Sequence, residues 1–188
     1  MRIQELFESL SSPRASGMTL QMPVLFRAET SRTRYPVGTF WTLSSTIADH
    51  YSRKTREATY RKIQVYVPRS LNLFSVDRVL EDHQFRISML DDLEQWASQR
   101  GFSSDDLENM RTYDVLKDRE PDFAYPVRDD VEYLRGIHGF DGVFYSMEGG
   151  MLVDTVFLFG DLPIETRYLT DVIEDENDPI HDLVLNAL

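Results

Sequence analysis

The chain has 188 residues, of which 41% are hydrophobic and 28% charged, and its formal net charge is −12. This length and composition fit one globular domain, and the absence of cysteine excludes disulfides, thiolate catalysis and cysteine-ligated zinc. No stretch approaches the ~20 apolar residues of a membrane span, and the charges within residues 1–10 are not typical of a signal peptide, so we expect a cytoplasmic protein.

The first part of the chain alternates between helical and extended patterns. The predicted elements are, in order, a helix over 2–10, a strand over 23–29, a strand over 39–42, a helix over 46–55, a strand over 59–67 and an extended piece over 71–76. Ser44 and Ser45 stand where a helix N-cap is expected. Arg27 is unusual because it interrupts an apolar strand.

The middle of the chain has a different pattern. From residue 77 to about residue 116 the apolar residues follow a helical period, with Leu93 and Trp96 on the packing face, and Ser103 begins a plausible capping box. We therefore predict a mainly helical insert over 77–130.

The last third of the chain predicts strands and then an acidic tail. A short helix over 130–138 precedes a turn and strand over 140–145, and a second strand covers 152–159. Residues 171–188 are expected to form a loosely ordered acidic tail. The fold class is therefore α+β, with an antiparallel or mixed sheet in a single domain over 1–188.

Charge is distributed unevenly between the two parts of the sequence. Residues 1–70 carry 11 basic and 5 acidic side chains, a net +6, whereas residues 71–188 carry 9 and 27, a net −18. A basic segment can receive a phosphate-bearing ligand. The acidic remainder argues against general nucleic-acid binding, because phosphate contacts supply most of that affinity.

Several standard motifs are absent from the sequence. There is no GxGxxG, GxxxxGK[ST] or GxSxG pattern, which removes the usual signals of a Rossmann fold, a P-loop and a nucleophile elbow. The four histidines form no HExxH motif, so we expect no metal site and interpret them as surface or packing residues.

Three short blocks remain: LFRA around Arg27, GTFWTLSS from Gly38 to Ser45, and FDGV at 140–143 followed by the strand containing Asp154. Together they resemble the ADP-ribosyltransferase domain of phage polyvalent proteins and related toxins. The resemblance covers both ends of the chain and omits residues 77–130. It implies a split antiparallel or mixed sheet with flanking helices, and NAD as substrate.

The resemblance also implies roles for particular side chains. Arg27 would bind the phosphates or ribose of NAD, since a guanidinium fork suits a pyrophosphate, although a structural salt bridge is the alternative. Thr42 and Ser44 would offer hydroxyls that orient the ribose, or else cap the helix. The aromatic residues that could supply a stacking face for nicotinamide, or else belong to the core, are Phe40, Trp41 and Tyr51.

The catalytic acid has two candidates, Asp154 and Glu148. The resembled family places a glutamate at the entry of the last strand, where this chain has Asp154, one methylene shorter; Glu148 is the expected residue type in a loop. We expect Arg27, Thr42 and one of these acids to converge on one cleft. Position 152 is leucine, where arginine-directed relatives carry a second acid, so arginine modification is not expected.

The sequence is therefore compatible with two functions. The first is an NAD-dependent ADP-ribosyltransferase or NAD glycohydrolase of phage origin, acting in a host cytoplasm on a host protein or on water. The second is a non-catalytic acidic binding protein that blocks a basic site on a host protein, for which the net −18 of residues 71–188 is the main support.

Overall fold

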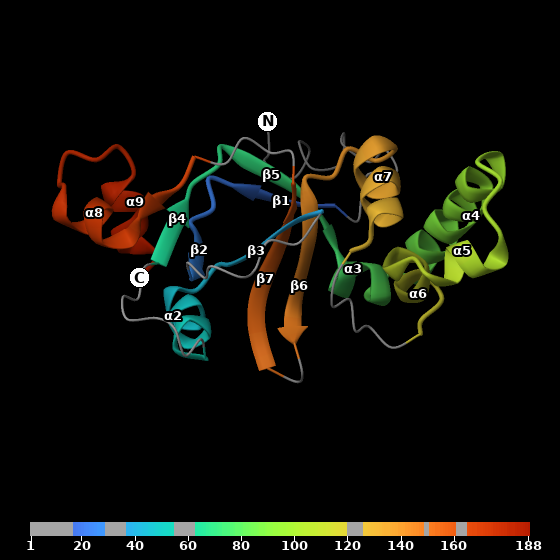
Figure 1. The fold of residues 1–188 in the computed structure, drawn as a ribbon, viewed down its shortest axis with the longest axis horizontal. Helices are drawn as coiled ribbons and strands as arrows, with labels where there is room; N and C mark the ends of the chain where they lie inside the picture. Colours follow the sequence, from blue (N-terminus) through green and yellow to red (C-terminus); the bar gives the residue numbers. More distant parts are fainter. Residues whose placement is uncertain (1–16, 29–36, 55–62, 120–125, 149–150, 161–164) are drawn as a thin grey trace, which may run out of the picture. The chain divides into compact units, whose positions relative to one another are not determined.

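Strands lie before and after a central run of helices, and two short helices follow the last strand (Figure 1). The computed structural model describes residues 17–28, 37–54, 63–119, 126–148, 151–160 and 165–188. The α+β class predicted from the sequence is confirmed. The helix expected over 2–10 lies outside the described residues.

The strands form one eight-stranded open sheet with the order β1-β5-β6-β7-β3-β2-β4-β8. Their bounds are β1 Gly17–Gln21, β2 Leu25–Ala28, β3 Gly38–Thr42, β4 Ile63–Tyr66, β5 Ser70–Ser75, β6 Gly142–Glu148, β7 Met151–Phe159 and β8 Arg167–Tyr168. The pairs β2·β3, β2·β4, β3·β7, β4·β8 and β6·β7 are antiparallel. Strands β1 and β8 were not predicted from the sequence.

Two glycines allow the neighbours of β7 to approach it closely. A Cβ added to Gly38 would lie 2.2 Å from the Leu158 carbonyl oxygen, and one added to Gly142 would lie 2.2 Å from the Phe157 carbonyl oxygen. Gly38 pairs with Phe159, and Gly142 pairs with Leu158. The glycines of the GTFWT and FDGV blocks are therefore required by the packing of β3 and β6 on β7.

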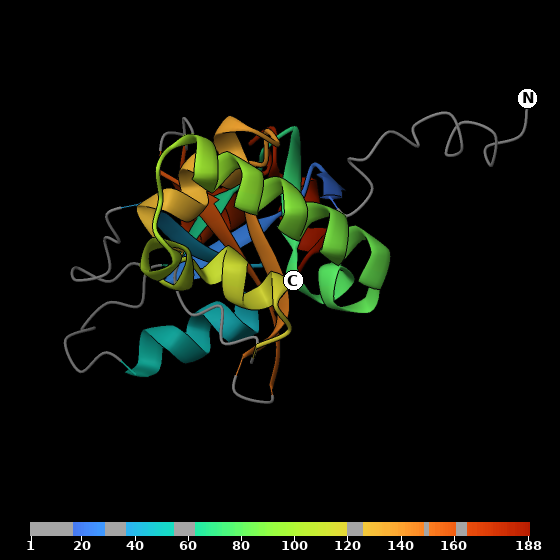
Figure 2. The ribbon, with the colours of Figure 1, turned by 90° about the vertical axis from the view of Figure 1, so that its right-hand side faces the viewer.

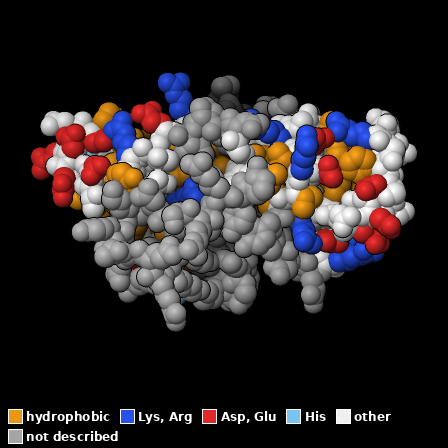
Figure 3. Space-filling view, viewed as in Figure 1, with side chains coloured by type: hydrophobic (Ala, Val, Ile, Leu, Met, Phe, Trp, Pro, Cys, Tyr) orange, Lys and Arg blue, Asp and Glu red, His pale blue; other side chains and the backbone are white. Residues whose placement is uncertain are grey.

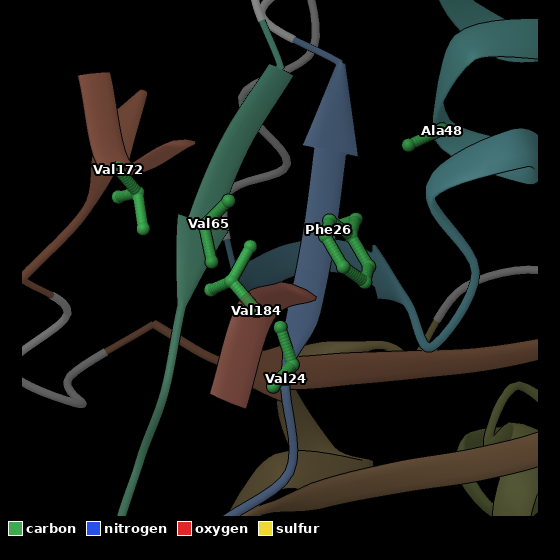
Figure 4. Packing of buried hydrophobic residues seen from close by; sticks show 6 residues of the cluster. All are labelled: Val24, Phe26, Ala48, Val65, Val172 and Val184. Carbon is green, nitrogen blue, oxygen red and sulfur yellow. The ribbon is translucent and has the colours of Figure 1, made fainter. Parts of the chain in front are cut away.

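Contacts divide the chain into two compact units, and the larger part of the sheet belongs to residues 19–73 and 141–188. Helices α2 (Ser45–Lys54), α8 (Leu169–Glu174) and α9 (His181–Asn186) also belong to this unit. One buried cluster joins them to β2 and β4, as Figure 4 shows; its members are Val24, Phe26, Ala48, Val65, Val172 and Val184. The burial of these side chains holds the helices against the sheet.

The expectation of a loosely ordered tail was wrong, because this cluster orders the segment. Residues 171–188 include most of α8 and all of α9, because Val172 and Val184 are fully buried at 0% exposure. All acidic side chains of the segment except Asp178, which pairs with Arg167, remain on the outside, and Figure 3 shows acidic side chains gathered over α8 and α9. The acidic composition obscured two buried apolar positions, which were enough to order the segment.

The second unit contains residues 74–140, which include the helices of the predicted insert. The helices are α3 (Val76–Glu81), α4 (His83–Gln99), α5 (Ser104–Glu108), α6 (Arg111–Leu116) and α7 (Arg128–Gly136). In Figure 2, α4 is the long helix of this unit. Leu93 and Trp96 are buried and Ser103 forms a capping box with Asp106, as predicted. Among the described residues, no helix is both long and apolar enough to cross a bilayer.

Asp130 ties together the parts of the helical unit. Its side chain is fully buried and accepts hydrogen bonds from the backbone N–H groups of Thr112 (2.8 Å), Val127 (2.8 Å) and Arg111 (3.2 Å). Burial raises the pKa of this carboxyl, and the three N–H donors oppose that effect. One carboxylate therefore satisfies the first turn of α6 and the start of α7.

We expect Gly142→Ala to lower the free energy of unfolding by about 1–3 kcal/mol, because the added methyl group would overlap the β7 backbone. Gly160→Ala is the matched control in the same unit, since a Cβ there meets its nearest atoms at an ordinary 3.5 Å. Urea unfolding of the two variants measures the difference. Equal stability of the two variants would contradict the close approach of β6 to β7.

Candidate functional site

The three sequence blocks lie on neighbouring strands. In the sheet order, β7, β3 and β2 are adjacent, so the strands carrying Asp154, Thr42 and Arg27 stand side by side (Figure 1). Thr42 pairs with Phe26 on one side and with Thr155 on the other. Strand β3 therefore pairs directly with an early strand, β2, and with a late strand, β7.

The side chains of Arg27 and Thr42 lie on opposite faces of the sheet. Antiparallel pairing of Phe26 with Thr42 places Arg27 opposite Trp41, and paired residues share a face. The guanidinium carbon of Arg27 lies 6.0 Å from the centre of the Trp41 ring, which agrees with this register. This arrangement differs from the single cleft expected for Arg27 and Thr42, because alternation along a strand separates residues whose backbones are close.

Thr42 and Ser44 shape the connection from β3 to α2. The Thr42 hydroxyl oxygen accepts a hydrogen bond from the Ser44 N–H at 3.2 Å, and Thr42 is 5% exposed. The Ser44 hydroxyl oxygen accepts a bond from the Ile47 N–H at 3.4 Å, which caps α2. The capping interpretation of Ser44 is thus confirmed. Both hydroxyls help to fix the turn that faces Asp154.

The aromatic residues of β3 pack within the protein. Phe40 lies edge-on to Phe157, with ring centres 4.7 Å apart, and also contacts Tyr145 at 6.2 Å. Trp41 is only 2% exposed, so its ring offers no open face on which nicotinamide could stack. Tyr51 lies on α2, and its side chain is outside the described residues. The core interpretation therefore holds for Trp41.

Asp154 occupies a β-bulge beside this turn. Between the pairs Tyr145↔Thr155 and Met147↔Leu152, β7 contains two residues where β6 contains one. Asp154 is exposed, and its φ of 37° lies in the left-handed region. Its carbonyl oxygen accepts a hydrogen bond from the Leu43 N–H at 3.2 Å. The bulge therefore presents an acidic residue directly beside the Thr42–Ser44 turn.

Glu148 lies farther from the turn than Asp154. Its backbone pairs with Met151, three residues before Asp154 on β7. Three residues of extended chain span about 10 Å. The backbone position thus favours Asp154 as the acid nearer to Thr42. Two expectations are corrected: Asp154 lies three residues inside β7 and not at its entry, and Glu148 is the last residue of β6 and not a loop residue.

A second polar cluster occurs in the helical unit, and the sequence analysis did not single it out. The Tyr133 hydroxyl is 3.0 Å from an Asp92 carboxylate oxygen and 3.1 Å from the Met89 carbonyl oxygen, and His138 Nε2 is 3.1 Å from the same Asp92 oxygen. His138 packs edge-on to Tyr133, which confirms a packing role for this histidine. In the described part of the chain, no group of three or more potential ligands could hold a metal ion.

Comparisons of the chain with models of known protein families, with curated proteins and with solved structures found no match. The residues of the sheet and their chemistry therefore carry the functional argument.

The positive φ in the bulge predicts that the stability of variants at position 154 depends on the shape of the new side chain. Asp154→Asn and Asp154→Gly should keep the fold, because both residues tolerate a positive φ, whereas Asp154→Val should lower the free energy of unfolding by about 1–3 kcal/mol. A β-branched side chain in the left-handed region clashes with its own backbone. Urea unfolding distinguishes the three variants, and a valine variant as stable as the glycine variant would show that the bulge is absent.

The helical cluster predicts a pH dependence of stability. Burial lowers the pKa of His138, although the Asp92 carboxylate opposes this effect. The unfolded chain then binds the proton more tightly, so the contribution of His138 is complete above its ordinary pKa of about 6.5 and is lost as the pH falls through the lowered value. We expect His138→Phe to flatten the fall in unfolding free energy between about pH 7 and pH 5. Parallel curves for variant and wild type would refute this role.

Proposed function

We propose that the protein is an NAD-dependent ADP-ribosyltransferase that transfers ADP-ribose to a protein side chain or to water. The observation that carries this proposal is the adjacency of β7, β3 and β2. Thr42 pairs with Phe26 and Thr155, which are the sequence neighbours of Arg27 and Asp154. These are the strands of the three blocks that resemble the transferase family. A chance resemblance of three short blocks would not require their strands to be neighbours.

The chemistry assigns different tasks to the two charged residues. Breaking the bond between nicotinamide and ribose passes through an oxocarbenium-like state, as in glycoside cleavage. A carboxylate near the ribose stabilises the developing positive charge, and Asp154 is the exposed acid beside the turn. Arg27 is half-buried in an apolar strand, where a guanidinium fork can bind a phosphate of NAD. The bond between nicotinamide and ribose breaks, and its electron pair leaves on neutral nicotinamide. The acceptor oxygen or nitrogen forms the new bond to the ribose carbon and releases its proton to solvent.

Thr42 has an indirect role in this proposal. Its hydroxyl accepts the Ser44 N–H, and its face of the sheet is opposite to that of Arg27. Thr42 therefore holds the turn against which Asp154 lies, and it shapes the site without contacting the phosphates that Arg27 binds.

The alternative function is an acidic binding protein, and the surface of α8 and α9 favours it. Residues 165–188 carry seven acidic side chains and one arginine. Six of the acids are exposed: Glu165, Asp171, Glu174, Asp175, Glu176 and Asp182. Such a surface would attract a basic partner, and high salt would weaken the complex.

Two measurements test the proposed activity. Thermal unfolding with and without millimolar NAD detects binding, because a ligand at about 100 times its dissociation constant adds about 2.7 kcal/mol to stability. Nicotinamide release from NAD then measures turnover. We expect Asp154→Asn to keep NAD binding and to lower release about 10²–10³-fold, since the charge that stabilises the cation is lost.

Glu148→Gln is the matched control for the acid, because it makes the same chemical change on the neighbouring strand. We expect it to lower nicotinamide release only slightly. The reverse pattern would assign the catalytic role to Glu148. A wild-type chain that neither binds NAD nor releases nicotinamide would reject the transferase and leave the acidic binding protein as the proposal.

A further inference from the structure

The described residues contain two arginine–tryptophan contacts, one in each unit. The guanidinium carbon of Arg27 lies 6.0 Å from the Trp41 ring centre, and that of Arg100 lies 4.7 Å from the Trp96 ring centre. Arg100 is exposed and also forms an ion pair with Glu132 at 2.5 Å. Arg27 is half-buried within the sheet, so neighbouring side chains restrict its conformation more than they restrict that of Arg100.

The indole of Trp41 is held on several sides. It is 2% exposed, and its Nε1–H donates a hydrogen bond to the Thr39 hydroxyl oxygen at 3.0 Å. Thr39 lies two residues earlier on β3 and therefore on the same face. The ring centre of Tyr66, on β4, lies 5.8 Å from that of Trp41. The plane of the indole is consequently fixed before any ligand arrives.

We propose that Trp41 is a positioning residue for Arg27. Thr39 orients the indole, the indole face orients the guanidinium, and the oriented guanidinium binds a phosphate of NAD. The identity of the ligand rests on the proposed function. The coupling from Thr39 through Trp41 to Arg27 rests on the geometry of these three residues alone.

A contact of this kind suits the binding of an anion. A cation–π contact attracts the guanidinium to the ring face without using an N–H donor, whereas a phosphate is recognised by those N–H donors. The ring therefore restricts the orientation of the fork without adding a negative charge that would compete with phosphate. This role replaces the stacking on nicotinamide that the sequence suggested for Trp41, whose ring is buried.

Tryptophan fluorescence tests the coupling directly. The chain has two tryptophans, so Trp96→Phe makes Trp41 the single reporter. In that background we expect Thr39→Val and Arg27→Met each to change the Trp41 emission, because one removes the hydrogen bond and the other removes the cation. Arg100→Met is the matched control and should leave this emission unchanged. If Trp96→Phe does not fold, difference spectra against the wild-type chain report the same changes.

Titration with NAD tests the consequence for the ligand. Thr39→Val and Trp41→Leu should weaken NAD binding about two- to thirtyfold, the range that one cation–π contact is worth, and Trp41→Phe should recover part of the loss. Inorganic pyrophosphate should show the same order of variants, because the coupling acts on the phosphate site.

The outcomes separate this proposal from the proposed function. If Arg27→Met leaves the Trp41 emission unchanged, the coupling is overturned whatever the chain binds. If Thr39→Val changes the emission while NAD affinity stays within about twofold of wild type, positioning is overturned and the transferase proposal stands. If the wild-type chain binds neither NAD nor pyrophosphate, both the transferase and the ligand of Arg27 are rejected.

Discussion

The antiparallel ladder between β3 and β7 is the constraint on which the candidate site depends. Five residue pairs, from Gly38↔Phe159 to Thr42↔Thr155, join an early strand to a late one. The ladder tolerates no side chain at Gly38, since a Cβ would meet the β7 backbone. Every proposed relation among the three sequence blocks follows from this pairing, because β2 is placed by β3 and Asp154 is placed by β7.

The same ladder decides which groups can act together. Its register places Arg27 and Trp41 on one face, and Thr42 on the other. The extra residue in β7 ends the regular alternation where β3 turns towards α2, and the Asp154 carbonyl continues the ladder by accepting the Leu43 N–H. A bulge is a common means of redirecting a side chain next to an active site. An exposed acid with a positive φ at this point is therefore the main structural support for the role proposed for Asp154.

The helical unit shows how buried polar groups are satisfied away from that site. Asp130 accepts three backbone N–H groups, and Tyr133 contacts both Asp92 and the Met89 carbonyl. Unpaired, each of these groups would cost about 1–3 kcal/mol, so their bonds select one arrangement of the helices. The lowered pKa of His138 predicts a pH dependence for the stability of this unit, and the cluster holds none of the residues proposed to bind NAD.

The sequence by itself determined the α+β class, the helices of the middle segment, most strands and the Ser44 and Ser103 caps. These are consequences of local periodicity and capping, which nearby residues decide. The choice of Arg27, Thr42 and either Asp154 or Glu148 as candidates came instead from the resemblance of three short blocks to a known family. The tertiary structure decided the neighbours of each strand, the opposite faces of Arg27 and Thr42, the bulge at Asp154 and the order of the acidic C-terminal segment. Pairing register depends on contacts between residues far apart in the sequence, and a shift of one residue exchanges the faces of a strand. Likewise, Val172 and Val184 order their helices only because a buried cluster is present to receive them.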